Sequence, residues 1–545
     1  MYVSLIRPGL SHWRTWTPQY PSLDSLWHAC LAAQLKRPEP RRDEPAEQAL
    51  WHHMLANIPT TPTNSPLVFS TTKGDLRVLG NIAASAAAQL HPAPGAYAIS
   101  AACASGVVAL IDAALHTRHG APTPVAGADM AGSFVSDGFA AFKALSASHC
   151  RPFDAARDGL ILGSAAASCL VRPALPEDIT IAGFGFRCDA VHMTAPDRHA
   201  RSLIAAIHDA LAMANIPPAD VDAILAHATG TRYNDAMEAT AFRAVFGPRS
   251  PAITGIKGVI GHTLGAAGLI ETAIACRMLA DQTIPPMAGL QHSEYADLDL
   301  VIAQPRRQPL NIILKTASGF GGMNAALLLR QPTPAPPPQV PPVSPVPPVP
   351  PPASVHIPTK HNSAAIDTAA NIRCIPPTAA PWPGPNGRDL PPIVQELARM
   401  AHALLAAAPD IPRDRIGIIL GTHHGCAFDD ALFDDSRRAD HGRFASPAAF
   451  ARTLPTTIPA HLGLLMGLRG PTFILSSGPA STRLALHRAA AWLQALHLPL
   501  ILAGGFEQHS ETRFRAALVA LRPSAAIPQS DSLQQLILSI KSAFI

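Results

Sequence analysis

The sequence predicts an α/β protein made of two bodies that a proline-rich linker separates. Three observations predict this. Short apolar runs typical of strands alternate with alanine-rich helical patterns, the order expected where helices cover the faces of a sheet. Between residues 332 and 352, 13 of 21 residues are proline, a composition that favours polyproline II over hydrogen-bonded structure. Segments of the second body also repeat segments of the first in the same order.

The first body, residues 1–330, shows the alternation most clearly. We expect strands at 97–100, 123–127, 223–226 and 311–315, and helices at 105–118, 200–214 and 266–281. Residues 331–389 form the linker, which the prolines predict to be a stiff spacer; a polyproline ligand for a partner domain is the alternative. The second body covers residues 390–545.

Composition and charge exclude several classes of protein. The chain has 545 residues, of which 48% are hydrophobic, so it has enough apolar surface for a large core. A net charge of +4 is too small for a nucleic-acid binder of this length. The eight cysteines form no CxxC pair, which favours reduced thiols over disulfides or a zinc finger. We find no signal peptide or membrane-spanning run and therefore expect a cytoplasmic protein.

The internal repeat matches three pairs of segments. AISAACASGVVAL (98–110) aligns with FILSSGPASTRLAL (473–486), VAGADMAG (125–132) with LAGGFEQ (502–508), and PLVFSTTKG (66–74) with IGIILGTHHG (416–425). In this register Cys103 faces Pro479. Chance similarity between alanine-rich helices is the alternative, but three matches in one order favour a repeat.

Three side chains carry candidate chemistry in the first body. Cys103 follows a predicted strand and lies at the first turn of a predicted helix, where free N–H groups stabilise a thiolate. A buried structural cysteine is the alternative. His227 and His262 each follow a strand and precede a helix, and Lys257 comes five residues before His262. We expect the two histidines to converge on one pocket with the cysteine.

Five motifs in the order AACASG, PFDAARDG, HATGTRYND, KGVIGHTLGAAG and SGFGGMNA resemble those of β-ketoacyl-[acyl carrier protein] synthases of the thiolase superfamily. The resemblance implies a thiolase-like layered α/β/α/β/α fold for 1–330. The Pro-rich linker and a partial thiolase-like α/β domain would follow, the latter a truncated synthase-like N-terminal half.

The resemblance also implies a catalytic trio of Cys103, His227 and His262. Cys103 would take an acyl group from a carrier-protein thioester. The two histidines would stabilise the enolate formed when malonyl carrier protein loses carbon dioxide, and the carbanion would attack the acyl-cysteine. The backbone N–H groups of Cys103 and Phe320 would form the oxyanion hole.

Other positions carry supporting roles by the same resemblance. Lys257 and Glu271 correspond to an ion pair that positions the second histidine. Phe320, flanked by Gly319 and Gly321, corresponds to a gating phenylalanine whose loop moves when an acyl chain enters.

Thr229 and Thr231 resemble threonines that bind a pantetheine arm. The resemblance implies no metal, nucleotide or flavin; the phosphopantetheine belongs to the acyl carrier protein partner. A homodimer, a heterodimer with another synthase-like subunit and a pseudo-dimer within the chain all remain open.

Four positions depart from the family pattern. Ala228 stands where glycine is usual, Ser164 replaces a glutamate, and Ser318 replaces a phenylalanine. Cys103 also comes unusually early in the chain. The shortened stretch normally contributes to the acyl pocket wall and to dimer contacts.

The second body cannot carry the same chemistry, because Pro479 has no nucleophilic atom. We expect it to be either a catalytically inert partner that resembles a chain-length factor or a fragment that fills a surface missing from the shortened first body. His423, His424 and Cys426 match no common zinc spacing, and a turn is the simpler interpretation.

The leading hypothesis is an elongating β-ketoacyl-[acyl carrier protein] synthase of type II fatty-acid or polyketide synthesis, aryl-polyene pigment synthesis included. The alternative is a non-catalytic, chain-length-factor-like partner of a separate ketosynthase.

Overall fold

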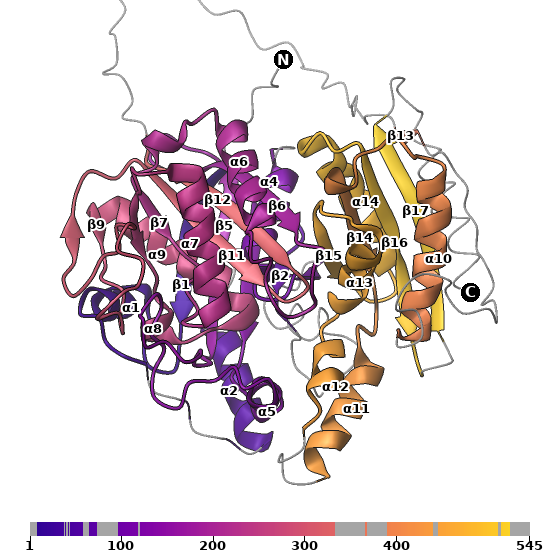
Figure 1. The fold of residues 1–545 in the computed structure, drawn as a ribbon, viewed down its shortest axis with the longest axis horizontal. Helices are drawn as coiled ribbons and strands as arrows, with labels where there is room; N and C mark the ends of the chain where they lie inside the picture. Colours follow the sequence, from indigo (N-terminus) through magenta and orange to yellow (C-terminus); the bar gives the residue numbers. More distant parts are fainter. Residues whose placement is uncertain are drawn as a thin grey trace, which may run out of the picture.

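The computed structural model describes residues 8–36, 39, 42, 44–57, 65–72, 96–117, 120–332, 366–367, 390–439, 445–510 and 514–523. Most of the predicted linker therefore lies outside the described residues. Helices of both bodies lie beside one sheet that runs through the molecule (Figure 1).

The first body alternates strands and helices as the sequence predicts. Its elements are β1 (Pro8–Trp16), α1 (Leu23–Leu31), α2 (Glu44–Ala56), β2 (Val68–Ser70), β3 (Tyr97–Ser100), α4 (Ser105–Thr117), β4 (Thr123–Asp129), α5 (Ser133–Ala141), β5 (Ala165–Pro173), β6 (Ile179–Cys188), α6 (Arg201–Ala214), β7 (Ala223–Leu225), α7 (Arg232–Phe246), β8 (Ala252–Thr254), α8 (Lys257–Ile260), α9 (Ala267–Asp281), β9 (Thr283–Ile284), β10 (Arg306–Arg307), β11 (Ile312–Gly319) and β12 (Met323–Arg330). All seven predicted elements are present, most of them shifted by one or two residues at one end; β11 runs four residues further than predicted.

The second body repeats this alternation on a smaller scale. Its elements are β13 (Ile366–Asp367), α10 (Pro392–Ala406), β14 (Ile416–Gly421), α11 (Ala427–Arg438), α12 (Pro447–Arg452), α13 (Thr457–Met466), β15 (Thr472–Ser476), α14 (Ser481–Ala495), β16 (Leu500–Gln508) and β17 (Phe514–Pro523). The two residues of β13 fall inside the predicted linker and pair with the end of β17.

Within the described residues the large sheet has fifteen strands, which form three units of five. The units run β3-β2-β4-β5-β1, then β6-β12-β11-β7-β8, and in the second body β13-β17-β16-β14-β15. When the strands of each unit are numbered in chain order, all three units follow the order 3-2-4-5-1 or its reverse. The same half-fold therefore occurs twice in the first body and once in the second.

The second body joins the first at the strand that leads to Cys103. β15 pairs antiparallel with β3, with Ile99 opposite Leu475. One hydrophobic core runs through this joint and holds Ile99 and Val108 together with Leu475 and Trp492. Figure 1 shows the second body, in orange and yellow, packed against the side of the first along this joint.

Two buried helices of the first body, α4 and α9, cross each other beside the large sheet. α4 is apolar on nearly every side, as expected for a helix with protein all round it. At its crossing with α9 the backbones touch: a Cβ on Gly106 would lie 2.6 Å from the nitrogen of Leu269, and one on Gly268 2.4 Å from that of Val107. This close approach draws together the chain segments that precede the two helices.

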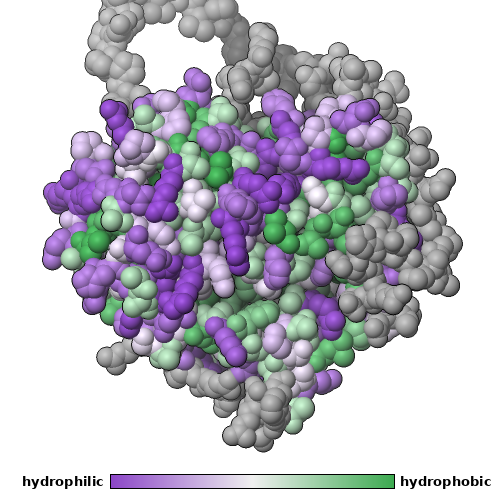
Figure 2. Space-filling view, viewed as in Figure 1, coloured by the Kyte–Doolittle hydropathy of each residue, from purple (hydrophilic) through white to green (hydrophobic). Residues whose placement is uncertain are grey.

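On the face of the molecule shown in Figure 2, hydrophilic side chains predominate over the first body and hydrophobic ones form scattered patches. Within the part of the chain that the structure describes, no helix is both long and apolar enough to cross a membrane.

Candidate active site

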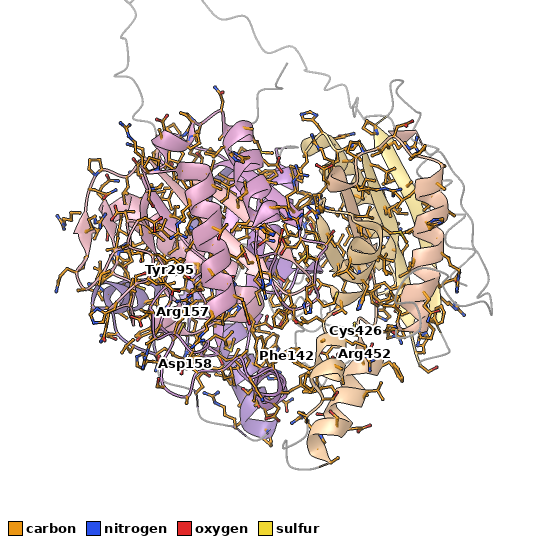
Figure 3. The ribbon with its side chains drawn as sticks, in the orientation of Figure 1. Phe142, Arg157, Asp158, Tyr295, Cys426 and Arg452 are labelled. Atoms are coloured by element: carbon orange, nitrogen blue, oxygen red, sulfur yellow. The ribbon has the colours of Figure 1, made fainter. Side chains whose placement is uncertain are left out.

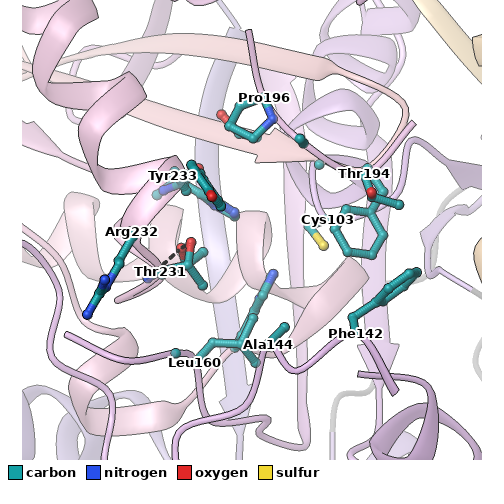
Figure 4. Close-up of a pocket in the computed structure, with 18 of the residues that line it drawn as sticks. Cys103, Phe142, Ala144, Leu160, Thr194, Pro196, Thr231, Arg232 and Tyr233 are labelled. Atoms are coloured by element: carbon teal, nitrogen blue, oxygen red, sulfur yellow. Dashed lines mark hydrogen bonds between the residues drawn. The ribbon is translucent and has the colours of Figure 1, made fainter. Parts of the chain in front are cut away.

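Cys103 lies in the tight turn between β3 and α4. Ala102 adopts a left-handed conformation, with a φ of 51°. The Ser105 hydroxyl ties the turn together: it accepts the N–H of Ala101 at 2.9 Å and donates to the carbonyl of Ala102 at 2.5 Å. The Cys103 side chain, 7% exposed, faces a pocket of about 400 Å³ (Figure 4).

Burial decides the protonation of this cysteine. It raises the pKa of the Cys103 thiol to about 12, although the nearby Lys257 ammonium acts in the opposite direction. The expected stabilisation of a thiolate by the helix N-terminus is therefore wrong for this state of the molecule. Cys103 sits two residues before the first helical residue, and desolvation outweighs the helix dipole there.

His227 follows β7 and is fixed through its backbone. Its N–H and that of Ala228 each donate to one oxygen of the Glu238 carboxylate, at 2.8 and 2.7 Å. The Lys257 ammonium lies 3.2 Å from Nδ1 of His227 and donates to the His227 carbonyl at 2.5 Å. An ammonium has no lone pair to offer, so Nδ1 is an acceptor and the neutral ring carries its proton on Nε2.

His262 follows the short helix α8 and is also held by its backbone. Its N–H donates to the carbonyl of Ile161 at 2.6 Å, and its carbonyl accepts the N–H of Gly163. Nδ1 accepts the N–H of Leu264 at 3.3 Å, which again leaves the ring proton on Nε2.

The imidazole rings of His227 and His262 contact each other in the pocket that Cys103 lines. Their ring centroids are 5.2 Å apart and their planes meet at 85°. Burial lowers the pKa of both rings well below the usual value, and Lys257 lowers it further. Both rings are therefore neutral at physiological pH, and both line the pocket that Cys103 also lines.

A buried charge cluster lies behind His227. The Lys257 ammonium lies 2.5 Å from one oxygen of Glu271, and the Lys315 ammonium 2.8 Å from the other, with all three side chains at most 1% exposed. The predicted ion pair of Lys257 and Glu271 is present. We expected this ion pair to position the second histidine, His262. That expectation was wrong, because the histidine that Lys257 contacts is His227.

Four further predicted residues, Thr229, Thr231, Gly319 and Phe320, line the same pocket, and Gly321 follows Phe320 in the chain. The hydroxyls of Thr229 and Thr231 are 2.9 Å apart at its edge. Phe320 and Gly319 form another wall, and a Cβ on Gly319 would lie 2.9 Å from the nitrogen of Cys103. Gly321 adopts a φ of 81° in the β11–β12 turn, a conformation that favours glycine.

Phe320 belongs to an aromatic cluster that reaches into the second body. Its ring stacks on Phe139 at 5.6 Å and meets Phe142 edge-on at 5.7 Å. Phe450 of α12 lies 5.7 Å from Phe139 and 5.6 Å from Phe142. In Figure 3, Phe142 stands on the side of the first body that faces Arg452 at the end of α12. The second body thus packs against the aromatic cluster that contains Phe320.

The position of Pro479 repeats the geometry around Cys103. The Ser481 hydroxyl accepts the N–H of Ser477 at 2.9 Å and donates to the carbonyl of Gly478 at 2.6 Å, as Ser105 does in the first body. Gly478, with a φ of 57°, takes the place of Ala102. Pro479 therefore occupies the equivalent of the cysteine position.

Family models match this chain three times. The model of the β-ketoacyl synthase N-terminal domain matches residues 64–176 and again residues 395–532. The model of the β-ketoacyl synthase C-terminal domain matches residues 179–291. The chain belongs to the β-ketoacyl synthase family.

Individual relatives agree with this assignment. A 3-oxoacyl-[acyl-carrier-protein] synthase 2 of Coxiella burnetii is 38% identical over 208 residues, which are 35% of this chain and 50% of the relative. A Streptomyces rimosus relative named for oxytetracycline polyketide synthesis is 36% identical over 255 residues, 43% of this chain and 60% of the relative. The chain thus spans half to three fifths of the length of these relatives.

A solved ketosynthase–chain length factor protein, PfaC, covers 96% of this chain and 79% of its own length with a TM-score of 0.73 at 15% identity. The ApeO–ApeC ketosynthase and chain length factor of Xenorhabdus doucetiae covers 60% of this chain and 98% of its own, with a TM-score of 0.51 at 22% identity. These likenesses confirm the predicted thiolase-like fold class.

The structure explains two departures from the family pattern. Ala228 has a φ of 48°, and a Cβ on Gly255 would lie 2.5 Å from the Ala228 Cβ, so Gly255 makes room for the alanine. Ser164 donates its hydroxyl to the Glu39 carboxylate at 2.8 Å, and its N–H donates to the other oxygen at 2.9 Å. A carboxylate from the N-terminal segment therefore lies beside the position where the family usually has its own.

Glu39 and Glu238 are residues that sequence reasoning missed. Glu238, Phe242 and Val245 share one buried face of α7, so a charge at helical spacing among apolar residues was the available signal for Glu238. Nothing in the local sequence marks Glu39. It also pairs with Lys36, whose N–H donates to the carbonyl of Gly258 beside Lys257.

The site offers no ready set of metal ligands. Among the residues that the structure describes, no group of three or more His, Cys, Asp or Glu side chains is placed to hold a metal ion. The described cysteines are all buried, and none of them is joined to another in a disulfide.

Proposed function

We propose that this chain is an elongating β-ketoacyl-[acyl carrier protein] synthase. The observation that carries the proposal is the convergence of Cys103, His227 and His262 on one pocket, with both histidines neutral and both rings protonated on Nε2.

In the first step Cys103 attacks the thioester of an acyl carrier protein. The Sγ–carbonyl bond forms, the bond to the pantetheine sulfur breaks, and the cysteine proton ends on the departing thiol. Because the resting thiol is neutral, deprotonation must accompany attack. The N–H groups of Cys103 and Phe320 would hold the oxyanion, since Gly319 brings this loop against the Cys103 nitrogen.

In the second step a malonyl thioester loses carbon dioxide. The electron pair moves onto the thioester oxygen, and the Nε2–H donors of His227 and His262 stabilise the enolate. Removal of one such donor typically costs about 2.7–4 kcal/mol. Lys257 supports this role by keeping His227 neutral, because a positive charge beside Nδ1 opposes protonation of the ring. The enolate carbon then attacks the carbonyl of the acyl-cysteine, a carbon–carbon bond forms, and the cysteine sulfur leaves as a thiolate that takes a proton from water.

Thr229 and Thr231 fit the pantetheine arm of the partner. Their two hydroxyls supply both donor and acceptor capacity at the edge of the pocket, which suits the amides of that arm. We propose that the enzyme has no resident cofactor, and that fatty-acid or polyketide synthesis supplies its acyl carrier protein.

We further propose that the second body acts as a chain-length factor in the same chain. It has Pro479 in place of the nucleophile, and its Phe450 backs the aromatic wall formed by Phe139, Phe142 and Phe320. The names of the PfaC and ApeO–ApeC structures, which pair a ketosynthase with a chain length factor, support this division of roles.

Intact-mass measurement after incubation with an acyl carrier thioester tests the proposal. We expect one acyl mass on the protein and none on Cys103→Ala. His262→Ala is expected to accept the acyl group but to lose most of its malonyl decarboxylation. No acyl mass, together with tight binding to a separate ketosynthase, would instead identify a non-catalytic chain-length-factor-like partner.

A further inference from the structure

The two bodies meet across a local pseudo-twofold axis. In the β3–β15 pair Ser100 lies opposite Ile474 and Ala98 opposite Ser476, so the axis passes between Ile99 and Leu475. These two residues are equivalent in the repeat, as are the turn serines Ser105 and Ser481. The same offset applies along β3 and α4 on one side and β15 and α14 on the other.

One ion pair lies on this axis. Asp112 of α4 and Arg488 of α14 are separated by the repeat offset of 376 residues. They are therefore equivalent positions, Asp112 in the first body and Arg488 in the second. Figure 1 shows α14 and β15 on the side of the second body that faces α4. Residues at such positions face their own equivalents across the axis.

The pair is buried and is held by several hydrogen bonds. Nε of Arg488 donates to Oδ1 of Asp112 at 2.9 Å, and Nη2 donates to the Asp112 carbonyl at 2.7 Å. Trp492 Nε1 donates to Oδ1 at 2.7 Å, and the Tyr97 hydroxyl donates to Oδ2 at 2.5 Å. Asp112 and Trp492 have no exposed surface, and Arg488 is 8% exposed.

The residues around the pair also differ between the two bodies, in a way that suits a carboxylate at position 112. Tyr97, which gives Asp112 a donor, is equivalent to Phe473, which has no hydroxyl and packs on Trp492 at 4.9 Å. The donors that a carboxylate needs therefore surround position 112 and come from both bodies. Burial and the Asp112 charge together raise the pKa of the Tyr97 hydroxyl, so it remains a donor.

We infer that the Asp112–Arg488 pair selects pairing between a first body and a second body, and rejects pairing between two first bodies or two second bodies. Two first bodies joined through β3 would bring two Asp112 carboxylates to the axis, and two second bodies would bring two Arg488 guanidiniums. Like charges without exposed surface lose their hydration and gain no partner, which is strongly unfavourable. The surface around α4 thus fits an arginine-bearing copy of its own half-fold.

Charge reversal in the full chain tests this inference. Asp112→Arg places two arginines at the axis of one chain, and Arg488→Asp places two aspartates there. We expect each variant alone to unfold several degrees below the wild type. Mixed together, the two variants have complementary surfaces. The native Asp112 of one chain meets the native Arg488 of the other at one joint, and the two substituted side chains form the reversed ion pair at the second joint.

We expect the mixture to form a reciprocal dimer with one chain of each variant, which native mass spectrometry identifies by its mass. If the variants do not fold separately, co-expression with two tags gives the same answer through a soluble one-to-one complex. Reversal of the exposed pair Arg243 and Asp297 is the control and should give no mixed dimer. Absence of a mixed dimer and of a co-expressed complex, or thermal midpoints equal to that of the wild type, would overturn the inference.

Discussion

Replacement of Glu238 by glutamine tests how the fold positions His227. Glu238 has no exposed surface. One carboxylate oxygen accepts the N–H of His227 and the Thr316 hydroxyl, both at 2.8 Å. The other accepts the N–H of Ala228 at 2.7 Å and the Asn234 amide at 3.0 Å. Glutamine keeps the shape of the side chain but turns one of these oxygens into an NH₂ group.

The size of the stability loss depends on which hydrogen-bond partners of Glu238 cannot become acceptors. The Thr316 hydroxyl and the Asn234 amide can rotate to become acceptors, whereas the backbone N–H groups of His227 and Ala228 cannot. At least one backbone N–H then loses a bond to a charged acceptor, worth about 1.5–3 kcal/mol, and faces a second donor. We expect a loss of about 2–4 kcal/mol in the free energy of unfolding, or roughly 2–5 °C in the thermal midpoint of a chain of this size.

Thermal unfolding of Glu238→Gln beside Asn234→Ala measures this effect. The alanine variant removes one rotatable partner of the same carboxylate and should lose no more than about 1 kcal/mol. Malonyl-thioester decarboxylation should fall at least tenfold in Glu238→Gln, because the turn that carries His227 shifts, while acylation of Cys103 persists. A Glu238→Gln protein with wild-type stability would refute the reasoning.

Three further outcomes follow from other contacts. The rate at which iodoacetamide alkylates Cys103, measured by peptide mass spectrometry, should rise about tenfold per pH unit from pH 7 to 10. The reason is that burial raises the thiol pKa to about 12, so each pH unit increases the thiolate fraction about tenfold. A rate that reaches a plateau near pH 8 would contradict this. Glu39→Gln should lower the rate of decarboxylation more than the rate of acylation, and Ser164→Glu in the same chain should restore part of the lost rate. If Glu39→Gln lowered both rates equally, a link from Ser164 to the His262 segment would be contradicted. Gly138→Ala should cost about 1–3 kcal/mol of stability, since its Cβ would lie 2.3 Å from the Phe450 ring, whereas the double variant with Phe450→Leu should recover most of it in thermal unfolding.

Much of the fold was predictable because its signals are local. The strand at 97–100 and the helix that follows it are set by apolar periodicity and small residues within some twenty positions, and β3 and α4 begin at the predicted residues. The convergence of Cys103, His227 and His262 was also predictable, because each lies where an α/β fold presents side chains at the ends of its strands.

The missing parts depend on contacts between distant segments. Glu39 meets Ser164 across 125 residues, and no local pattern encodes that meeting. The partner of Lys257 depends on how α8 packs beside the His227 turn, which spacing alone leaves open. The thiol pKa of Cys103 was misjudged for a related reason: the helix dipole is visible in the sequence, whereas the depth of burial is a property of the assembled core.

During synthesis, β3 is made long before β15, the strand that pairs with it. Asp112 and Arg488 are 376 residues apart, which at 5–20 residues per second is roughly 20–75 s of synthesis. In the later part of that interval, once β12 has been made, β3 has β2 on one side and no partner on the other, and it lies beside an uncovered apolar helix. Unpaired edges of this kind recruit neighbouring chains on a polysome. The nascent first body therefore exposes an edge that can pair with other chains until its own C-terminal portion arrives to cover it.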